Sequence, residues 1–218
     1  MKANLSPTTI SRVFLTHLHM DHCLEFPSIV FGSYLLGRTA SWDLHGPTGT
    51  EEFCSLLFRR VFPYAPEIVR RILKEGLEVK PYEVTAGRVF ENEKYRIDSA
   101  PTVHGIPSFA FRIESREGTV VISGDTRPCK SLIDLASGAD LLIHECSFPD
   151  DMVDFARETY HSVPSEVGDV ANQAGVKKVV LTHLFPPCNG REEEIVQSVH
   201  VKFGGEVIAS HDLLEISV

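Results

Sequence analysis

A short segment crowded with metal-binding side chains constrains this chain more than any other feature. Residues 16–22 read THLHMDH and follow RVFLT, an apolar run at residues 12–16 that predicts a buried strand. Four such groups in one extended loop would crowd one another unless a cation lay between them. Imidazole and carboxylate together favour zinc or a similar transition metal; the alternative is a solvated histidine-rich loop. The four candidate ligands are His17, His19, Asp21 and His22.

Three further candidate ligands stand at the ends of predicted strands. His104 follows Val103, Asp125 ends VVISGD after Gly124, and His183 ends KVVLTH. Taken alone, each fits a structural role, either a hydrogen-bonded core histidine or an aspartate that caps a turn. Taken with the THLHMDH segment, they complete the ligands that two metal ions need, with one carboxylate bridging. Two metal ions about 3.5–4 Å apart can activate a bridging hydroxide and stabilise the charge that develops in a displacement.

Composition indicates an ordinary globular chain and limits nucleic-acid binding to a local surface. The 218 residues, 43% apolar and 23% charged, suit a single domain, 1–218. The net charge is −9, whereas a protein that binds nucleic acid over its whole surface is usually basic. Residues 59–74 hold five basic residues against one acidic residue, and they either contact phosphates or form a solvated helix face. The charged residues of this basic stretch are Arg59, Arg60, Glu67, Arg70, Arg71 and Lys74.

Cysteine usage and hydropathy predict a cytoplasmic protein that does not enter a membrane. The cysteines are odd in number and show no CxxC spacing, which favours a reducing compartment and free thiols. The longest near-apolar run, residues 29–37, is far short of a membrane span, and the first ten residues contain no apolar signal core. The five cysteines are Cys23, Cys54, Cys129, Cys146 and Cys188.

Short apolar strands alternate with helix-like segments, which predicts an α/β fold whose sheets are covered by helices. Strands are predicted at residues 12–16, 42–45, 79–85, 95–100, 109–114, 119–123, 141–145, 178–182, 206–209 and 213–216. Helices are predicted at residues 26–38, 50–62, 66–74, 164–174 and 192–203. In the helix at 164–174, Ser162 is the expected N-cap and Gly175 the expected stop. The candidate ligands follow strand ends, where a rigid scaffold presents chemistry.

Several motifs in order resemble the metallo-β-lactamase fold superfamily. Residues 17–22 match its HxHxDH signature, and the later histidines and aspartate follow in the order of its other ligands. Within the superfamily the chain most resembles the ribonuclease Z branch and its arylsulfatase-like relatives. The resemblance implies an α/β fold of the αββα sandwich type. The segments that carry it are GPTGT at 46–50, HGIPSFAFRI at 104–113, SGDTRPC at 123–129, LIHEC at 142–146 and HS at 161–162.

The resemblance implies a role for each residue of these motifs. One metal ion would be bound by His17, His19 and His104. The second would be bound by Asp21, His22 and His183, with Asp125 bridging the two ions. Zinc is the expected metal, with manganese and iron as alternatives.

Three residues have expected catalytic roles that also follow from the resemblance. Asp21 would orient or deprotonate the attacking water, in addition to binding metal. Glu145 and His161 would form a supporting pair, in which His161 contacts a phosphate oxygen or protonates the leaving group. The structural alternatives are an ion-paired strand-end carboxylate for Glu145 and a helix-start histidine for His161. His144 is expected to face away from Glu145, so we place it outside the site.

Three features depart from the ribonuclease Z pattern. Only sixteen residues precede the HxHxDH segment, whereas the family places a further pair of strands there, so the fold is expected to be N-terminally short. The connection at 114–118 leaves no room for the long arm with which ribonuclease Z grips tRNA. After His183 the chain reads LFPP, where the family typically has a serine and an Arg-Tyr pair near the substrate phosphate.

The leading expectation is a dinuclear metal-dependent phosphodiesterase of the ribonuclease Z type, which processes the 3′ end of tRNA precursors. A homodimer is expected from the same resemblance. One alternative is an arylsulfatase-like or other small-molecule ester or lactone hydrolase, which the missing arm and the acidic charge favour. Another is an inactive metal-binding remnant. Hydrolysis of β-lactams is not expected, because that branch lacks the elements of Glu145 and His161 seen here.

Overall fold

The computed structural model describes residues 5–61 and 78–218, with side chains omitted at 59–61. Most contacts between residues fall within two compact units, Met1–Val84 and Thr85–Val218, here called the N-terminal and C-terminal units. Each unit has its own sheet and its own hydrophobic core. The single domain expected at 1–218 stays a prediction.

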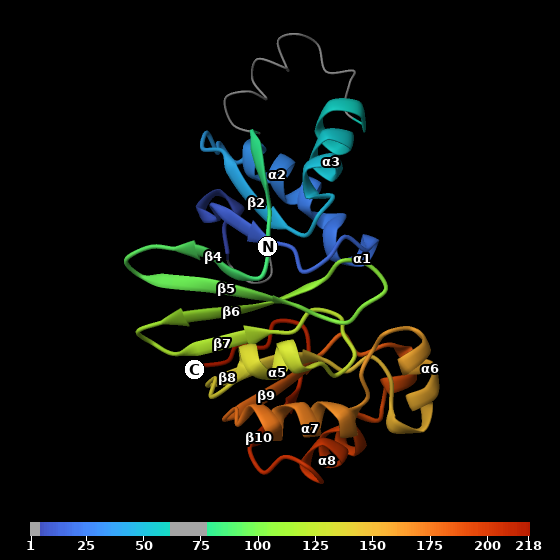
Figure 1. Ribbon diagram of the computed structural model, residues 1–218. Helices are drawn as coiled ribbons and strands as arrows, with labels where there is room; N and C mark the ends of the chain where they lie inside the picture. The colour runs from blue at the N-terminus through green and yellow to red at the C-terminus, as the bar shows by residue number, and fades with distance from the viewer. Residues whose placement is uncertain (1–4, 62–77) are drawn as a thin grey trace. The chain divides into compact units, whose positions relative to one another are not determined.

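The N-terminal unit consists of a parallel three-stranded sheet with helices (Figure 1). Trp42 and Leu44 are fully buried and pack with Phe26 and Val30 in one core, because alternate residues of a strand face the same side. The strands, in sheet order, are β1 (Arg12–Phe14), β2 (Trp42–Gly46) and β3 (Val79–Glu83). The helical elements are η1 (Pro7–Thr9), α1 (Met20–Cys23), α2 (Glu25–Leu35), α3 (Thr50–Ser55) and the π-helical η2 (Leu56–Val61).

The C-terminal unit has a seven-stranded mixed sheet in the order β10-β9-β8-β7-β6-β5-β4. Neighbours from β4 to β7 are antiparallel, and neighbours from β7 to β10 are parallel. The parallel half brings the carboxyl ends of β7, β8 and β9 to one edge of the sheet. The strands are β4 (Gly87–Glu91), β5 (Tyr95–Pro101), β6 (Phe109–Ser115), β7 (Thr119–Ile122), β8 (Leu141–Glu145), β9 (Lys178–Thr182) and β10 (Glu206–Ala209).

Helices pack on one side of this sheet and enclose its core. Figure 1 shows α5, α7 and α8 along the same side. Leu142 and Leu181 of the sheet are fully buried with Leu132 of α5, Val167 of α7 and Val199 of α8. The helical elements are α5 (Lys130–Ala136), η3 (Asp150–Met152), α6 (Val153–Glu158), α7 (Pro164–Ala174), η4 (Pro186–Cys188) and α8 (Glu192–His200).

Most predicted elements are confirmed, several with shifted ends. The helix predicted at 164–174 is α7, and the strands predicted at 141–145, 178–182 and 206–209 are β8, β9 and β10. As expected, Gly175 ends α7 in a left-handed conformation. The sequence patterns do not predict α1, β4, α5 or α6, which are short or weakly patterned. The helix predicted at 66–74 lies outside the described residues.

Two local predictions are wrong. The strand predicted at 213–216 does not form, because Leu213 has φ +65°, a left-handed backbone that an extended strand cannot contain. The N-cap of α7 is Val163 rather than Ser162. The Ser162 hydroxyl instead donates to the carbonyl of Thr126 at 2.7 Å, and the carboxylate of Glu166 accepts from the Val163 amide at 3.4 Å. Within residues 5–61 and 78–218, no helix is long and apolar enough to cross a membrane.

Candidate metal centre and hydrolytic site

The N-terminal unit gathers the three histidines of the THLHMDH segment. His17 is fully buried, and its ring centroid lies 4.0 Å from that of His22 and 4.8 Å from that of His19. The Oδ2 atom of Asp21 lies 3.4 Å from Nε2 of His22. The Nδ1 atom of His17 lies 3.1 Å from the Thr16 hydroxyl. Imidazoles grouped around one point with a carboxylate beside them form a ligand set of the zinc type.

The sequence predicts an extended loop for the THLHMDH segment. The structure differs, because α1 occupies Met20–Cys23. In an extended chain the five steps along the backbone from His17 to His22 would span about 17 Å. The helical turn instead returns the His22 ring to that of His17. The buried Cys23 thiol donates to the carbonyl of Leu18 at 3.7 Å, which closes the turn.

In the C-terminal unit the candidate side chains come from neighbouring strand ends. Asp125 follows β7, Glu145 ends β8, and His183 follows β9. Because these three strands are parallel neighbours, their carboxyl ends lie at one edge of the sheet. Gly124 turns the chain after β7 with φ +62°, and His183 itself has φ +57°. A left-handed backbone costs a non-glycine residue about 1–2 kcal/mol, and such strain is concentrated at functional sites.

The donor atoms at this edge fit a divalent metal ion. Ligand atoms of Asp125, His161 and His183 all lie within 4.8 Å of one another. The Nε2 atom of His183 lies 3.5 Å from Oδ2 of Asp125, and the rings of His161 and His183 stack with centroids 5.6 Å apart. One carboxylate and two imidazoles are a common ligand set for zinc. The chemistry of this donor set therefore agrees with the metal expected from the sequence.

Glu145 is the buried acceptor of this site. Its carboxylate is 1% exposed, and Oε1 lies 3.1 Å from Nδ1 of His161. The amides of Thr126 and Ser162 also donate to Oε1, both at 3.1 Å. The amide of Ser147 donates to Oε2 at 3.0 Å, and the Ser147 hydroxyl donates to the same oxygen at 2.7 Å. A buried charge is expensive unless it is hydrogen-bonded, and these donors satisfy both oxygens.

His104 is oriented by the backbone of a distant loop. Its Nδ1 atom lies 3.2 Å from the carbonyl oxygen of Tyr160, and its ring centroid lies 5.3 Å from that of His161. Tyr160 has φ +63°, a strained conformation that directs this carbonyl. An isolated bridge between Val103 and Arg127 ties the loop of His104 to the segment that follows Asp125.

Comparisons with known proteins identify the family of this chain. A family model described as Beta-lactamase superfamily domain matches residues 2–184. The chain belongs to this superfamily. A ribonuclease Z of Methanosarcina acetivorans is 30% identical, over all of this chain and 84% of that protein. A ribonuclease Z of Mycobacterium bovis is 33% identical, over 96% of this chain and 80% of that protein.

Solved structures of the superfamily show the same fold. The metallo-β-lactamase fold protein YhfI from Bacillus subtilis has a TM-score of 0.77 at 24% identity, over 95% of this chain and 77% of that chain. Human tRNase Z, short form, has a TM-score of 0.76 at 24% identity, over 100% of this chain and 82% of that chain. The α/β metallo-β-lactamase fold expected from the sequence is therefore confirmed.

The ligand set expected for this superfamily member draws on both units. His17, His19, Asp21 and His22 lie in the N-terminal unit, and His104, Asp125 and His183 lie in the C-terminal unit. Within each unit the structure brings its share of these residues together, and their joint assignment to two ions stays a prediction. His161 was expected only as a supporting group, but its ring nitrogen lies among the possible ligand atoms of the C-terminal unit.

The sequence motifs did not indicate Ser147, which contacts both His161 and His183 through its hydroxyl. A serine two residues after the strand-end glutamate is the signal that could have found it. His144 stays outside the site. It is fully buried, and its Nδ1 atom lies 2.6 Å from the backbone carbonyl of Glu145. Burial lowers the pKa of His144, while the nearby Glu145 opposes that shift.

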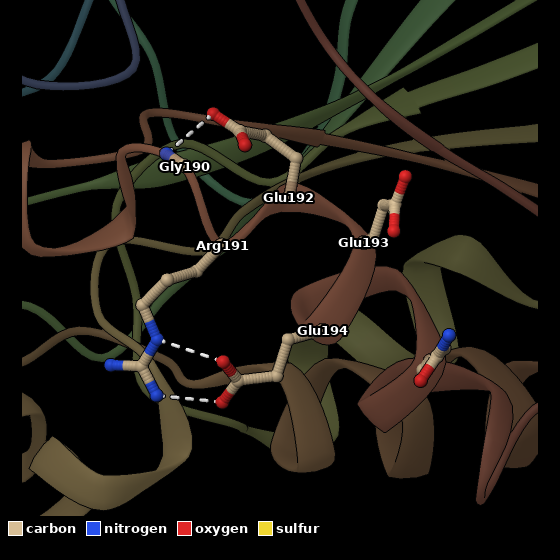
Figure 2. Close-up of a pocket in the computed structure, with 6 residues that line it drawn as sticks. Gly190, Arg191, Glu192, Glu193 and Glu194 are labelled. Carbon is tan, nitrogen blue, oxygen red and sulfur yellow. Dashed lines mark hydrogen bonds and ion pairs between the residues drawn. The ribbon is translucent and has the colours of Figure 1, made fainter.

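A pocket of about 460 Å³ lies at the start of α8 and is not part of this site. In Figure 2 the Arg191 guanidinium points to Glu194, to which it donates at 2.6 and 2.9 Å, and the amide of Gly190 points to Glu192. Arg191 also lies 3.1 Å from Asp151. The arginine is therefore neutralised by its neighbours, and the pocket has an acidic lining. It contains none of the residues that the sequence predicts to be functional.

The basic stretch predicted to contact phosphates is not placed. Its residues Glu67, Arg70, Arg71 and Lys74 lie outside the described part of the chain, and the side chains of Arg59 and Arg60 are not described either.

Proposed function

We propose that this chain is a metal-dependent hydrolase that cleaves RNA as an endonuclease of the ribonuclease Z type, at the 3′ end of tRNA precursors. The observation that carries the proposal is the Glu145–His161 pair, 3.1 Å apart, beside Asp125 and His183 at one sheet edge. This chain aligns over 80% or more of the length of two relatives that are named ribonuclease Z. A metal centre beside a buried acid–imidazole pair is suited to a displacement at phosphorus.

Seven residues are proposed to hold two divalent ions, with zinc as the expected metal. Bound metal would supply an activated hydroxide and neutralise negative charge that builds up on the phosphate. The proposed ligands are His17, His19 and His104 for one ion, and Asp21, His22 and His183 for the other, with Asp125 bridging.

Proton transfer and orientation are the remaining roles, and they are proposed for three side chains. Asp21 is proposed to orient the attacking water and to accept its proton. His161 is proposed to hold a proton for the leaving oxygen on Nε2, since its Nδ1 faces Oε1 of Glu145 at 3.1 Å. Glu145 keeps the His161 ring in that orientation and stabilises its protonated form.

The short connection between β6 and β7 bears on the choice of substrate. Only residues 116–118 join these strands, so the arm expected of ribonuclease Z has no place there. The alignment with the Methanosarcina acetivorans protein spans 269 positions for a chain of 218 residues, so this chain lacks a residue at 51 of them. The alignment with the Mycobacterium bovis protein spans 226 positions. The Mycobacterium bovis ribonuclease Z therefore aligns with this chain with far fewer gaps than the Methanosarcina acetivorans protein.

The short connection also favours a second candidate, a small-molecule ester or lactone hydrolase that acts at the same site. A substrate of that kind needs no arm, and the net charge of −9 does not attract RNA. This candidate differs from the first only in substrate, so a direct assay separates the two.

The test is cleavage of a precursor tRNA with a 3′ trailer, in zinc and in manganese, with bound metal measured in parallel. We expect one cut at the 3′ end of the tRNA body. His19→Ala should abolish the cut while the far-ultraviolet spectrum stays that of a folded chain, because one ligand is lost from the surface of its unit. His200→Ala, at an exposed histidine of α8, is the matched control and should cut normally.

Three other results would decide against the proposal. No cut with two metals bound would favour the small-molecule hydrolase, and bound metal without turnover of any substrate would favour the inactive metal-binding remnant. A fully active His19→Ala protein would remove this residue from the metal site.

Two further properties are proposed from the sequence alone. A homodimer rests on the resemblance to ribonuclease Z, and its test is the mass in solution by light scattering. A cytoplasmic location rests on the odd number of cysteines and the lack of CxxC spacing, and the five thiols are free in the structure. Localisation of a tagged full chain would test it.

A further inference from the structure

We propose that Ser147 is a positioning residue that holds the proton of His183 on Nδ1 and thereby places the lone pair of the ring on Nε2, where a metal ion would bind. The inference rests on the proposed function, since it concerns a proposed ligand. It concerns a residue to which the sequence motifs assign no role. All the contacts that carry it lie inside the C-terminal unit.

The first step is the direction of the hydrogen bond between Ser147 and Glu145. The Glu145 carboxylate accepts from three backbone amides, those of Thr126, Ser147 and Ser162. A backbone N–H group can only donate, so this side chain is built into the fold as an acceptor. The Ser147 hydroxyl lies 2.7 Å from Oε2 and must donate its single proton there.

The second step follows from that donation. With its proton given to Glu145, the Ser147 oxygen has only lone pairs to offer its other neighbours. It lies 2.8 Å from Nδ1 of His183 and 3.1 Å from Nδ1 of His161. Both ring nitrogens must therefore carry a hydrogen. Ser147 is fully buried, so water does not compete for these lone pairs.

The third step concerns the other nitrogen of His183. Its Nε2 atom faces Oδ2 of Asp125 at 3.5 Å, which is longer than a normal hydrogen bond. The 2.8 Å contact of Nδ1 with an oxygen that can only accept holds the single proton of the neutral His183 ring on Nδ1. Metal binding requires a lone pair, and the Nδ1–H form presents it on Nε2, toward the carboxylate proposed as the bridging ligand.

The fourth step distinguishes the two histidines that contact the Ser147 hydroxyl. His161 has a second acceptor for its Nδ1 proton, Oε1 of Glu145 at 3.1 Å. Loss of the Ser147 hydroxyl removes an acceptor from both rings, but Glu145 still holds the tautomer of His161. The effect of removing this hydroxyl should therefore appear at His183 and not at His161, which damage to the whole site would not produce.

The experiment measures ring tautomers in the metal-free full chain by nitrogen-15 NMR. His183→Gln and His161→Gln assign the two sets of signals. In the wild-type chain we expect both rings as the Nδ1–H form. In Ser147→Ala we expect His183 to become a mixture of tautomers while His161 stays unchanged. Ser147→Thr keeps the hydroxyl and should keep the wild-type His183 signal.

The same variants are then titrated with zinc against a competing chelator. Loss of a partner to a metal-ligating histidine typically weakens metal binding by about 10–100-fold, and we expect Ser147→Ala to fall in this range. Ser99→Ala is the matched control. It removes another buried serine hydroxyl of the same unit, which donates to the Thr85 carbonyl at 2.7 Å, and should leave zinc affinity unchanged.

The outcomes separate this inference from the proposed function. An Nε2–H form of His183 in the wild-type chain, or an unchanged His183 signal and zinc affinity in Ser147→Ala, would overturn the role of Ser147 even if the wild-type protein cuts RNA. A wild-type chain that shows the expected tautomers but binds no metal would support the role of Ser147 and overturn the proposed function.

Discussion

At the scale of single residues, the buried carboxylate of Glu145 organises the candidate site of the C-terminal unit. Both of its oxygens accept from backbone amides, so its place is determined by the turns that follow β7 and β8 as much as by its own strand. The remaining donors are the side chains of Ser147 and His161. Because both oxygens already accept hydrogen bonds, replacing one of them by a hydrogen-bond donor should lower the free energy of unfolding.

The free energy of unfolding of Glu145→Gln tests this hydrogen-bond arrangement. The amide nitrogen would replace an oxygen to which N–H groups already point, and a buried donor left without an acceptor costs about 1–3 kcal/mol. We expect the free energy of unfolding in urea to fall by about this amount. Glu117→Gln, at an exposed residue of the turn between β6 and β7, should leave it unchanged. Equal stability of the two variants would contradict the arrangement around Glu145.

At the scale of elements, short turns between regular structures decide where the functional side chains lie. Gly124 and His183 leave their strands with left-handed backbones, and both do so at the edge of the sheet that carries the candidate site. Gly175 does the same at the end of α7, on which Val167, Val170 and Ala171 are buried in the core. A turn of this kind is a property of the element and can be tested without touching the site.

Gly175→Ala isolates the conformational requirement of this turn. Gly175 has φ +63°, and a methyl group at its Cα would meet no heavy atom within 4 Å. The cost is therefore that of the left-handed conformation alone, about 1–2 kcal/mol of unfolding free energy. Gly204→Ala is the control, since it also has open space and no positive φ. It should be unchanged or slightly more stable in the same urea titration.

At the scale of the whole molecule, the free energy of unfolding should depend on pH through a buried histidine. His144 lies fully buried in the C-terminal unit, and among the described residues its Nε2 has no hydrogen-bond partner. Burial lowers its pKa below the ordinary value of 6.5. Between the lowered pKa and 6.5 the unfolded chain binds more protons than the folded chain, so stability falls as the pH falls below 6.5.

The expected result is a weaker pH dependence in His144→Asn, which keeps a side-chain donor near the Glu145 carbonyl and cannot be protonated. The difference in slope between this variant and the wild type should approach at most about 1.4 kcal/mol per pH unit below pH 6.5 and vanish above it. His200→Asn, at an exposed histidine, should follow the wild type. Urea unfolding from pH 5 to 8 measures all three, and a His144→Asn slope equal to the wild type would contradict the prediction.

Much of this protein could be predicted from its sequence, because the signals involved are local. Alternating or continuous apolar runs predicted β8, β9 and β10. The helix α7 was predicted from Pro164 at its start and Gly175 after its end. The fold family also followed from the sequence, because ordered motifs of a few residues each are carried by the chain itself. The candidate ligands stood out for the same reason, as polar groups placed directly after apolar strands.

The tertiary structure decided what depends on partners distant in sequence. The sequence gives no sign that the Ser162 hydroxyl would bond to Thr126 rather than cap α7, or that Leu213 would turn instead of extending a strand. The role of Ser147 depends on two histidines 14 and 36 residues away. The sequence by itself determined the elements and the candidate chemistry. Under the role proposed for Ser147, hydrogen bonds between separate strand ends decide which nitrogen of His183 carries the proton, because a proton position depends on neighbours that only the folded chain brings together.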